Sequence, residues 1–435
     1  MHINAQLDVD VVSVEKDDTV TVMLDLAAPD AERKAERPPA AVIVVLDRSG
    51  SMSGGRLDAG KRALVALVDR LDDNDLFGLV TFDDEALLVV AAHPIGELGR
   101  ANVQHKIATV HTGGSTDLSS GYLRGLQEAR RVAAPGGTTV VVLSDGRANT
   151  GITDPARFRQ AAAGAATQAI TTSTIGIGTG YDDLILSEMA IGGTGNHTFA
   201  EEADAAAAAV AGELEGLLSK TVQAASLLVK PTDDVIQVSV MNDMPSQRVD
   251  GGVMVELGDF YAGEQRRLLV TLEVPAMAGL GLAQVADLEL AYVSIPGLQA
   301  HTVTLPISVN VVPQDVARGR VPDAQVQREK LILDAQSAKR RSEDALRRGD
   351  LHAARSGLTD TRTSLTEAMA SAPDPDLGEE IDFLTDSLLD LDRRDAEYTG
   401  KKLSADRTKK SRGFRGRTQG GEWDGKFPTD EGESA

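Results

Sequence analysis

The sequence predicts an α/β domain with a mainly parallel central sheet, joined to a β-sandwich and followed by a helical hairpin or bundle. Three observations lead to this prediction: strands and helices alternate over residues 40–218, only strands are indicated over 219–313, and apolar residues recur at helical spacing over 321–398. Domains commonly have roughly 150 residues, so a chain of 435 residues is also expected to contain about three of them.

The composition is that of an acidic globular protein with an aliphatic core. Lys and Arg total 44 against 66 Asp and Glu, for a formal net charge of -22; hydrophobic residues make up 42% and aromatic residues only 3%. The chain has no cysteine, which excludes disulfides, thiolate metal sites and cysteine nucleophiles. The acidity argues against general nucleic-acid binding, which needs a basic surface.

The N-terminal residues MHINAQLDVD contain acidic residues and no long apolar run, so they resemble neither a signal peptide nor a transit peptide. No stretch approaches the roughly 20 apolar residues that span a bilayer. We therefore expect a cytoplasmic protein without a membrane span.

Residues 1–30 predict two strands in which apolar and polar residues alternate. The apolar positions are Leu7, Val9 and Val11, then Val20, Val22, Leu24 and Leu26. A two-stranded hairpin is marginally stable alone, so we expect both strands to join the β-sandwich of residues 219–313.

The α/β domain of residues 40–218 begins with the run Ala41-Val-Ile-Val-Val-Leu-Asp47, which is typical of a strand covered on both faces. Further strands are expected at 77–82, 86–92, 138–145 and 171–178, and helices at 57–71, 118–132, 158–168, 183–190 and 203–218. Strands that alternate with helices predict a mainly parallel sheet with helices on both faces.

The C-terminal part divides into a helical region at 321–398 and a basic tail at 401–435. The helical pattern is broken at Gly349-Asp350 and at 373–375, and such short breaks favour antiparallel neighbouring helices. The tail is rich in Lys, Arg, Gly and Ser without apolar periodicity, so we expect it to be disordered. The segment around Trp423 has two interpretations: a solvated extension, or a short motif that a partner recognises.

Three short segments carry the residues with the clearest chemistry. Asp47, Ser49 and Ser51 follow the first buried strand, Thr116 precedes the helix at 118–132, and Asp145 ends another buried strand. Because ligands bind beyond the carboxyl ends of parallel strands, we expect Asp47 and Asp145 to lie together, with the Thr116 loop over them.

These five residues offer two carboxylates and three hydroxyls, an all-oxygen ligand set that suits Mg²⁺ or Mn²⁺. Two carboxylates neutralise the ion but leave it short of ligands. Water or an incoming carboxylate then completes the shell, so the site is interpreted as a docking point for an acidic side chain.

The segments resemble the von Willebrand factor type A (VWA) domain, whose metal-ion-dependent adhesion site (MIDAS) has the pattern Asp-x-Ser-x-Ser, then Thr, then Asp. The resemblance covers about residues 40–218 and implies a Rossmann-like fold in which Asp47, Ser49, Ser51, Thr116 and Asp145 bind the metal. The segment LGDFYAGEQRRLLVTLEVP resembles the sandwich that accompanies this domain in inter-alpha-trypsin-inhibitor-heavy-chain-like and bacterial relatives.

Simpler interpretations exist for each motif. The Asp47-x-Ser-x-Ser segment could only shape a strand-to-helix turn, but three matching segments on successive elements favour the metal site. The segment Gly55–Lys61 resembles a phosphate-binding loop, but Arg62 stands where that loop needs Ser or Thr. The segment Gly176-x-Gly178-x-Gly180 resembles a dinucleotide-binding fingerprint, but its last glycine comes one position too early. Both are interpreted as structural.

Two acidic positions near these motifs are also assigned structural roles. Asp117 is expected to cap the helix that starts at Leu118, and Asp83-Asp84 to occupy the turn of a hairpin.

The sequence therefore predicts a non-enzymatic, metal-dependent protein-binding module whose partner presents Asp or Glu. The resemblance implies an assembly role beside a separately encoded ATPase, which is one candidate partner. One alternative is a structural scaffold with a vestigial metal site. The other is a metal-assisted hydrolase, but the sequence shows no group of His, Glu or Lys that indicates a general base.

Overall fold

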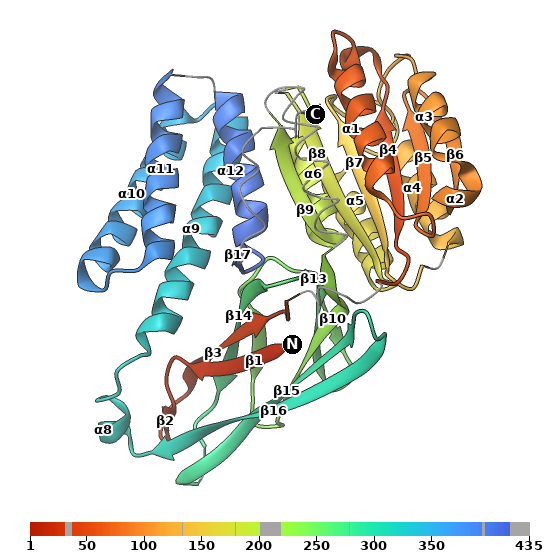
Figure 1. The fold of residues 1–435 in the computed structure, drawn as a ribbon. Coiled ribbons are helices and arrows are strands. Elements are labelled where there is room, and N and C mark those ends of the chain that lie inside the picture. Colours follow the sequence, from red (N-terminus) through yellow and green to blue (C-terminus); the bar gives the residue numbers. More distant parts are fainter. Residues whose placement is uncertain are drawn as a thin grey trace, which may run out of the picture.

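The computed structural model describes residues 1–30, 37–132, 134–178, 180–200, 219–277, 279–393 and 396–417. These residues form an α/β domain (37–200), a two-sheet domain (1–30 and 219–312) and a helical domain (314–410) (Figure 1). The helix predicted at 203–218 and Trp423 lie outside the described residues.

The α/β domain is built on a sheet with the strand order β6-β5-β4-β7-β8-β9. Its strands are β4 (Ala41–Asp47), β5 (Leu76–Phe82), β6 (Ala86–Pro94), β7 (Thr138–Ser144), β8 (Ile170–Ile177) and β9 (Thr194–Ala200). All neighbouring pairs are parallel except β5 and β6, which form an antiparallel hairpin. The predicted mainly parallel sheet is confirmed.

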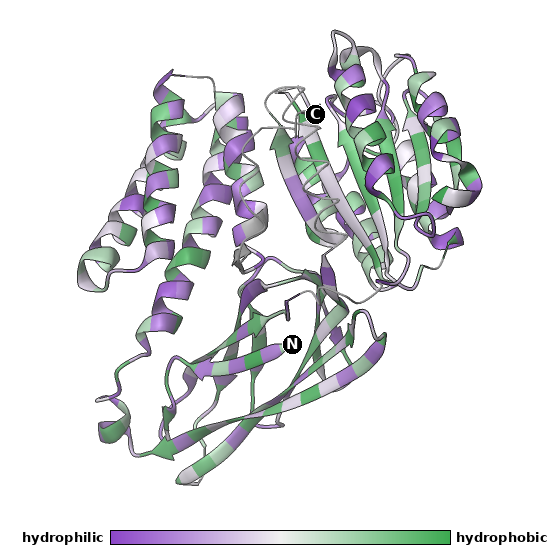
Figure 2. Cartoon of the chain, in the orientation of Figure 1, coloured by the Kyte–Doolittle hydropathy of each residue, from purple (hydrophilic) through white to green (hydrophobic). Residues whose placement is uncertain are grey.

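Both faces of this sheet are covered, which explains the uninterrupted apolar run of β4. Val42, Val44 and Leu46 pack into one apolar cluster, and the alternate residues Ile43 and Val45 pack into the cluster on the opposite face. Figure 2 shows the hydrophobic residues concentrated on these central strands.

The helices of this domain are α1 (Arg56–Arg70), α2 (Ile95–Leu98), α3 (Arg100–Ala108), α4 (Leu118–Arg131), α5 (Pro155–Ala166) and α6 (Asp183–Gly192). Residues of α1 and α3 enter one cluster, and residues of α4, α5 and α6 enter the other. The sequence did not predict α2, α3 or β9. In α3 only Val103 and Ile107 are buried, too few to create a clear helical period.

The two-sheet domain contains β1 (His2–Leu7), β2 (Val11–Ser13), β3 (Asp18–Ala27), β10 (Lys220–Pro231), β11 (Gln237–Val240), β12 (Ser246–Val249), β13 (Gly252–Tyr261), β14 (Glu264–Val274), β15 (Gly281–Ser294) and β16 (Gln299–Val312). One sheet has the order β1-β3-β14-β11 and the other β12-β13-β10-β15-β16-β2. The N-terminal β3 pairs with β14 along its whole length, and residues of both sheets share one apolar cluster.

The helical domain contains α8 (Gln314–Ala317), α9 (Ala324–Arg347), α10 (Leu351–Ser371), α11 (Pro375–Arg393) and α12 (Ala396–Lys410). The chain reverses at Gly349, which has a φ of 77°, and Asp350 then caps α10 by accepting a hydrogen bond from the Ala353 amide at 2.9 Å. None of the helices in the described ranges is both long and apolar enough to cross a membrane.

The prediction that the chain is disordered from Lys401 onward is wrong for residues 401–417. Helix α12 packs against α9, β9 and α6 (Figure 1), and β17 (Phe414–Arg417) adds to the edge of the two-sheet domain beside β14. The basic side chains pair with acids on other helices: Lys402 with Asp390 at 2.7 Å and Lys410 with Glu380 at 2.7 Å. Composition alone cannot reveal such pairs, because each partner comes from a different helix.

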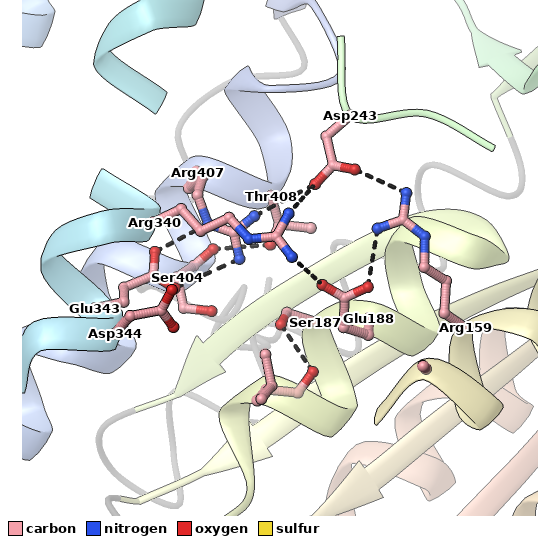
Figure 3. Close-up of polar contacts among 12 residues, drawn as sticks. Arg159, Ser187, Glu188, Asp243, Arg340, Glu343, Asp344, Ser404, Arg407 and Thr408 are labelled. Carbon is pink, nitrogen blue, oxygen red and sulfur yellow. Dashed lines mark hydrogen bonds and ion pairs between the residues drawn. The ribbon is translucent and has the colours of Figure 1, made fainter. Parts of the chain in front are cut away.

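Ion pairs join the three domains where α12 meets α6 (Figure 3). This junction cluster consists of Arg159 of α5, Glu188 of α6, Asp243 after β11, Arg340 and Glu343 of α9, and Arg407 of α12. Arg159 contacts Glu188 at 2.9 Å and Asp243 at 2.7 Å, so the α/β and two-sheet domains share one guanidinium.

Candidate metal site

The candidate metal site lies at the carboxyl ends of β4 and β7. Ser49, Ser51, Thr116 and Asp145 line one pocket there, and Asp47 lies beneath it as the last residue of β4. The structure therefore brings together all five residues that the sequence singled out.

Asp47 is fully buried and held by hydrogen bonds to both carboxylate oxygens. The Ser49 amide donates to Oδ1 at 2.8 Å, and the Ser144 hydroxyl donates to Oδ2 at 2.6 Å. Burial raises the pKa of Asp47 to about 6, with a smaller contribution from the Asp145 charge, and these effects outweigh the hydrogen bonds from Ser144 and Ser49. A cation beside Asp47 would compensate this buried negative charge.

The two serines connect Asp47 to Asp145. Ser49 Oγ and Ser51 Oγ share a hydrogen bond at 3.0 Å, and the Ser51 hydroxyl donates to Asp145 Oδ1 at 2.7 Å. Ser49 and Asp145 are buried, whereas Ser51 is exposed, so the chain of oxygens reaches from the interior to the surface.

Thr116 approaches from the loop before α4. Its amide donates to Asn149 Oδ1 at 3.1 Å, which ties this loop to the segment after Asp145. A Cβ atom added to Gly146 would lie 3.0 Å from Thr116 Oγ1, 3.2 Å from Ser51 Oγ and 3.5 Å from Asp47 Oδ2. Oxygens from two of the three segments thus surround one point next to Gly146, which belongs to the third.

Two acidic residues that the sequence placed only in a turn also position this loop. Asp83, between β5 and β6, pairs with Arg48 at 2.7 Å and accepts a hydrogen bond from the Gly114 amide at 3.2 Å. Asp84 accepts a hydrogen bond from the Ser115 amide at 2.8 Å. Close approach of these carboxylates requires glycine at 113 and 114, because an added Cβ would clash with them. The Asp-Asp and Gly-Gly pairs were visible in the sequence, but nothing local linked them.

Arg56 is a further residue that the sequence did not assign to the site. Its guanidinium donates to Asp145 Oδ2 at 2.8 Å.

The predicted cap of the helix that starts at Leu118 is confirmed, since Asp117 Oδ1 accepts a hydrogen bond from the Ser120 amide at 3.0 Å.

The glycine motifs interpreted as structural have packing roles. An added Cβ at Gly176 would overlap the Tyr181 ring, so this glycine allows the ring to pack closely. Gly60 and Lys61 lie inside α1, where their amides take part in helical hydrogen bonds. The amides of Gly60 and Lys61 are therefore not available to bind a phosphate.

The donor chemistry fits a hard divalent cation. Within the described ranges, no group of three or more His, Asp or Glu side chains is arranged to hold a metal ion, so a cation here would rely on the hydroxyls as well as the two carboxylates. Carboxylate and hydroxyl oxygens are ligands for Mg²⁺ and Mn²⁺ rather than for softer metals.

Comparison with known proteins finds a family match that includes the segments of this site. Residues 41–212 match the family model of the von Willebrand factor type A domain. The chain is 25% identical over 350 residues to an uncharacterized protein of Synechocystis, covering 75% of this chain and 81% of the relative. It is 27% identical over 184 residues to human inter-alpha-trypsin inhibitor heavy chain H3, covering 38% of this chain and only 20% of that protein.

A solved structure is similar over nearly the whole chain. The von Willebrand factor type A protein from Catenulispora acidiphila superposes with a TM-score of 0.70 at 18% identity, covering 94% of this chain and 96% of that one. At this identity the similarity concerns the fold, which extends beyond the α/β domain. The chain therefore contains a region similar to the von Willebrand factor type A domain, at residues 41–212, within a fold that it shares along nearly its whole length with a solved von Willebrand factor type A protein.

Proposed function

We propose that this protein is a non-enzymatic, metal-dependent protein-binding module. In this proposal Asp47, Ser49, Ser51, Thr116 and Asp145 hold Mg²⁺ or Mn²⁺, and a protein partner completes the coordination shell with an Asp or Glu carboxylate.

The observation that carries the proposal is the convergence of oxygens beside Gly146. Asp47 Oδ2 and Ser51 Oγ come from one segment and Thr116 Oγ1 from another, yet each would lie within 3.5 Å of one atom added to Gly146 in the third segment. A strand-to-helix turn that only needed capping would not require oxygens from a second, distant segment. The buried Asp47 carboxylate adds a second argument, because burial of its charge is unfavourable without a compensating cation.

The choice of an acidic partner follows from charge and exposure. Two carboxylates balance a divalent cation, and the neutral serine and threonine hydroxyls leave it electrophilic toward another anionic ligand. The exposed Ser51 and Gly50 lie at the pocket opening, where a side chain from outside can reach. A separately encoded ATPase is one partner to look for.

The pocket favours binding over hydrolysis. Metal-assisted hydrolysis needs a general base near the metal, and the pocket-lining residues of the described ranges include no His, Lys or Glu. The scaffold alternative differs in a measurable way, since it predicts partner binding that is independent of the metal.

The test is affinity capture with the whole 435-residue chain in Mg²⁺ and in EDTA, with bound proteins identified by mass spectrometry. The variants are Asp47→Ala and Asp145→Ala, and the matched control is Asp69→Ala, which removes a carboxylate from the exposed face of α1. Calorimetric titration with MnCl₂ measures the cation directly, and circular dichroism reports the fold.

We expect the wild type and Asp69→Ala to bind Mn²⁺ and to capture the same partner only when metal is present. Asp47→Ala and Asp145→Ala should lose both activities and keep their secondary structure. Equal capture of the partner in Mg²⁺ and in EDTA would refute the proposal and support the scaffold alternative.

A further inference from the structure

Arg56 places a positive charge on one of the two carboxylates of the candidate metal site. Its Nη1 donates to Asp145 Oδ2 at 2.8 Å and to the Ser51 carbonyl oxygen at 3.1 Å. We propose that Arg56 competes with the cation for Asp145, lowering the metal affinity of the site, and gives the loaded site a net positive charge toward a partner carboxylate. This inference rests on the proposed function.

The fold holds Arg56 at this place through the turn that starts α1. Gly54 and Gly55 have φ values of 73° and 99°, and no atom lies within 4 Å of a Cβ built on either of them. The backbone conformation, and not lack of space, therefore calls for glycine. Arg56 is the first residue of α1, directly after this turn, and its guanidinium lies against Gly178, where an added Cβ would be 3.6 Å from Nη2.

Asp145 has no carboxylate oxygen left without a donor. Ser51 donates to Oδ1 at 2.7 Å, Arg56 donates to Oδ2, and the side chain is fully buried. A cation that draws on Asp145, directly or through a water molecule, must share this carboxylate with a guanidinium of the same sign. Like charges a few ångströms apart repel, and the repulsion is stronger beside the buried Asp145 carboxylate than in bulk water, so Arg56 opposes metal binding.

The formal charges show how Arg56 changes the net charge of the site when a cation is bound. Asp47 and Asp145 carry two negative charges, so a divalent cation alone would leave the loaded site neutral. With Arg56 included, the loaded site has one excess positive charge. The side chain of Arg56 is 43% exposed, so this charge can also be felt by a ligand that approaches from solvent. Arg56 would thus reduce cation affinity and increase carboxylate affinity.

The experiment is calorimetric titration of the whole 435-residue chain with MnCl₂, as the wild type and as the variants Arg56→Gln, Arg56→Lys and Arg70→Gln. Arg70→Gln is the matched control, because it removes the same charge from the last residue of the same helix, about 20 Å away at 1.5 Å per residue. Acetate is then titrated into each Mn²⁺-loaded protein, and its binding is followed by the loss of water-proton relaxation as a water leaves the metal.

We expect Arg56→Gln to bind Mn²⁺ about tenfold more tightly than the wild type and acetate several-fold more weakly, as estimated from one like charge at a half-exposed site. Arg56→Lys should stay near the wild type in both titrations, since it keeps the charge, and Arg70→Gln should match the wild type. Both differences should shrink at high salt.

Two results overturn the inference while leaving the proposed metal site intact: unchanged or weaker Mn²⁺ binding in Arg56→Gln when the wild type binds, or unchanged acetate binding in that variant. A purely structural role for Arg56 predicts the weaker binding, because the Ser51 loop would lose a contact. Absence of Mn²⁺ binding in the wild type and in every variant would instead overturn the proposed function.

Discussion

Arg407 of α12 donates a hydrogen bond from Nε to Glu343 Oε1 of α9 at 2.9 Å, and the two side chains are only 2% and 1% exposed (Figure 3). Arg407 also lies 3.5 Å from Asp243 of the two-sheet domain. The basic stretch that composition assigned to a disordered tail therefore supplies a buried residue to the place where the domains meet.

Arg407→Ala should destabilise the protein strongly. The substitution leaves Glu343 buried without its main partner, and breaking one side of a buried ion pair costs about 3–5 kcal/mol. Urea denaturation of the full chain, followed by circular dichroism, measures the change. The control is Arg355→Ala, which breaks an exposed pair with Asp392 and should leave the midpoint unchanged.

If Arg407→Ala does not fold, the double variant Arg407→Leu with Glu343→Leu tests the same point. Replacing both charges with apolar side chains removes the unpaired charge and should restore most of the stability. A midpoint for Arg407→Ala equal to that of the wild type would contradict the assigned role of the pair.

Stability should fall in acid as the junction cluster loses the charge of Asp243. Burial by itself would raise the pKa of Asp243, but Arg159, Arg407 and Arg340 outweigh it and hold the pKa below its ordinary value of 3.8. Because the folded pKa is lower than the unfolded one, the stabilisation is present above about pH 4 and is lost as the pH falls through the folded pKa.

Melting temperatures of the wild type and Asp243→Asn between pH 7 and pH 3 measure this contribution. The variant should melt well below the wild type at pH 7, and the two curves should converge at the acidic end. A difference that stays constant over the whole range would show that the carboxylate charge is not what stabilises the junction.

Gly146→Ala should weaken cation binding without removing any ligand. The added methyl group would lie 3.0 Å from Thr116 Oγ1 and 3.2 Å from Ser51 Oγ, in the space where the oxygens converge. We expect the affinity for Mn²⁺ to fall at least tenfold, measured by electron paramagnetic resonance of free Mn²⁺. Gly164→Ala is the control: it lies in α5 with no atom within 4 Å of its added Cβ, and should leave Mn²⁺ binding unchanged. Equal affinity in both variants would place the cation elsewhere.

Arg412→Ala should loosen the start of β9. The Arg412 guanidinium donates to the backbone carbonyls of Thr194 and Gly195, with the Thr194 contact at 2.6 Å. Hydrogen–deuterium exchange should become faster over β9 and β17, while peptides from β4 and β5 exchange as in the wild type. Arg348→Ala, at the exposed end of α9, is the matched control. Unchanged exchange in β9 would show that this clamp does not hold the strand.

The candidate site was largely predictable because its geometry follows from strand direction. Asp47 and Asp145 each stand at the carboxyl end of a buried strand, and parallel neighbours such as β4 and β7 bring those ends together. Asp83, Asp84 and Arg56 were not predicted as part of the site. Their partners lie in other loops and strands, and neither residue type nor spacing indicates those contacts.

Local pattern alone determined the alternation of strands and helices, the breaks at Gly349 and Pro373, and which residues are candidate oxygen ligands. Each of these features depends on residues within a few positions along the chain. Only the tertiary structure decided that α12 is ordered and that Arg56 faces Asp145. Arg407 and Glu343 are 64 residues apart, and Arg56 and Asp145 are 89 apart. Whether a charge is solvated or paired depends on such distant partners, and the folded backbone alone brings them within hydrogen-bonding distance.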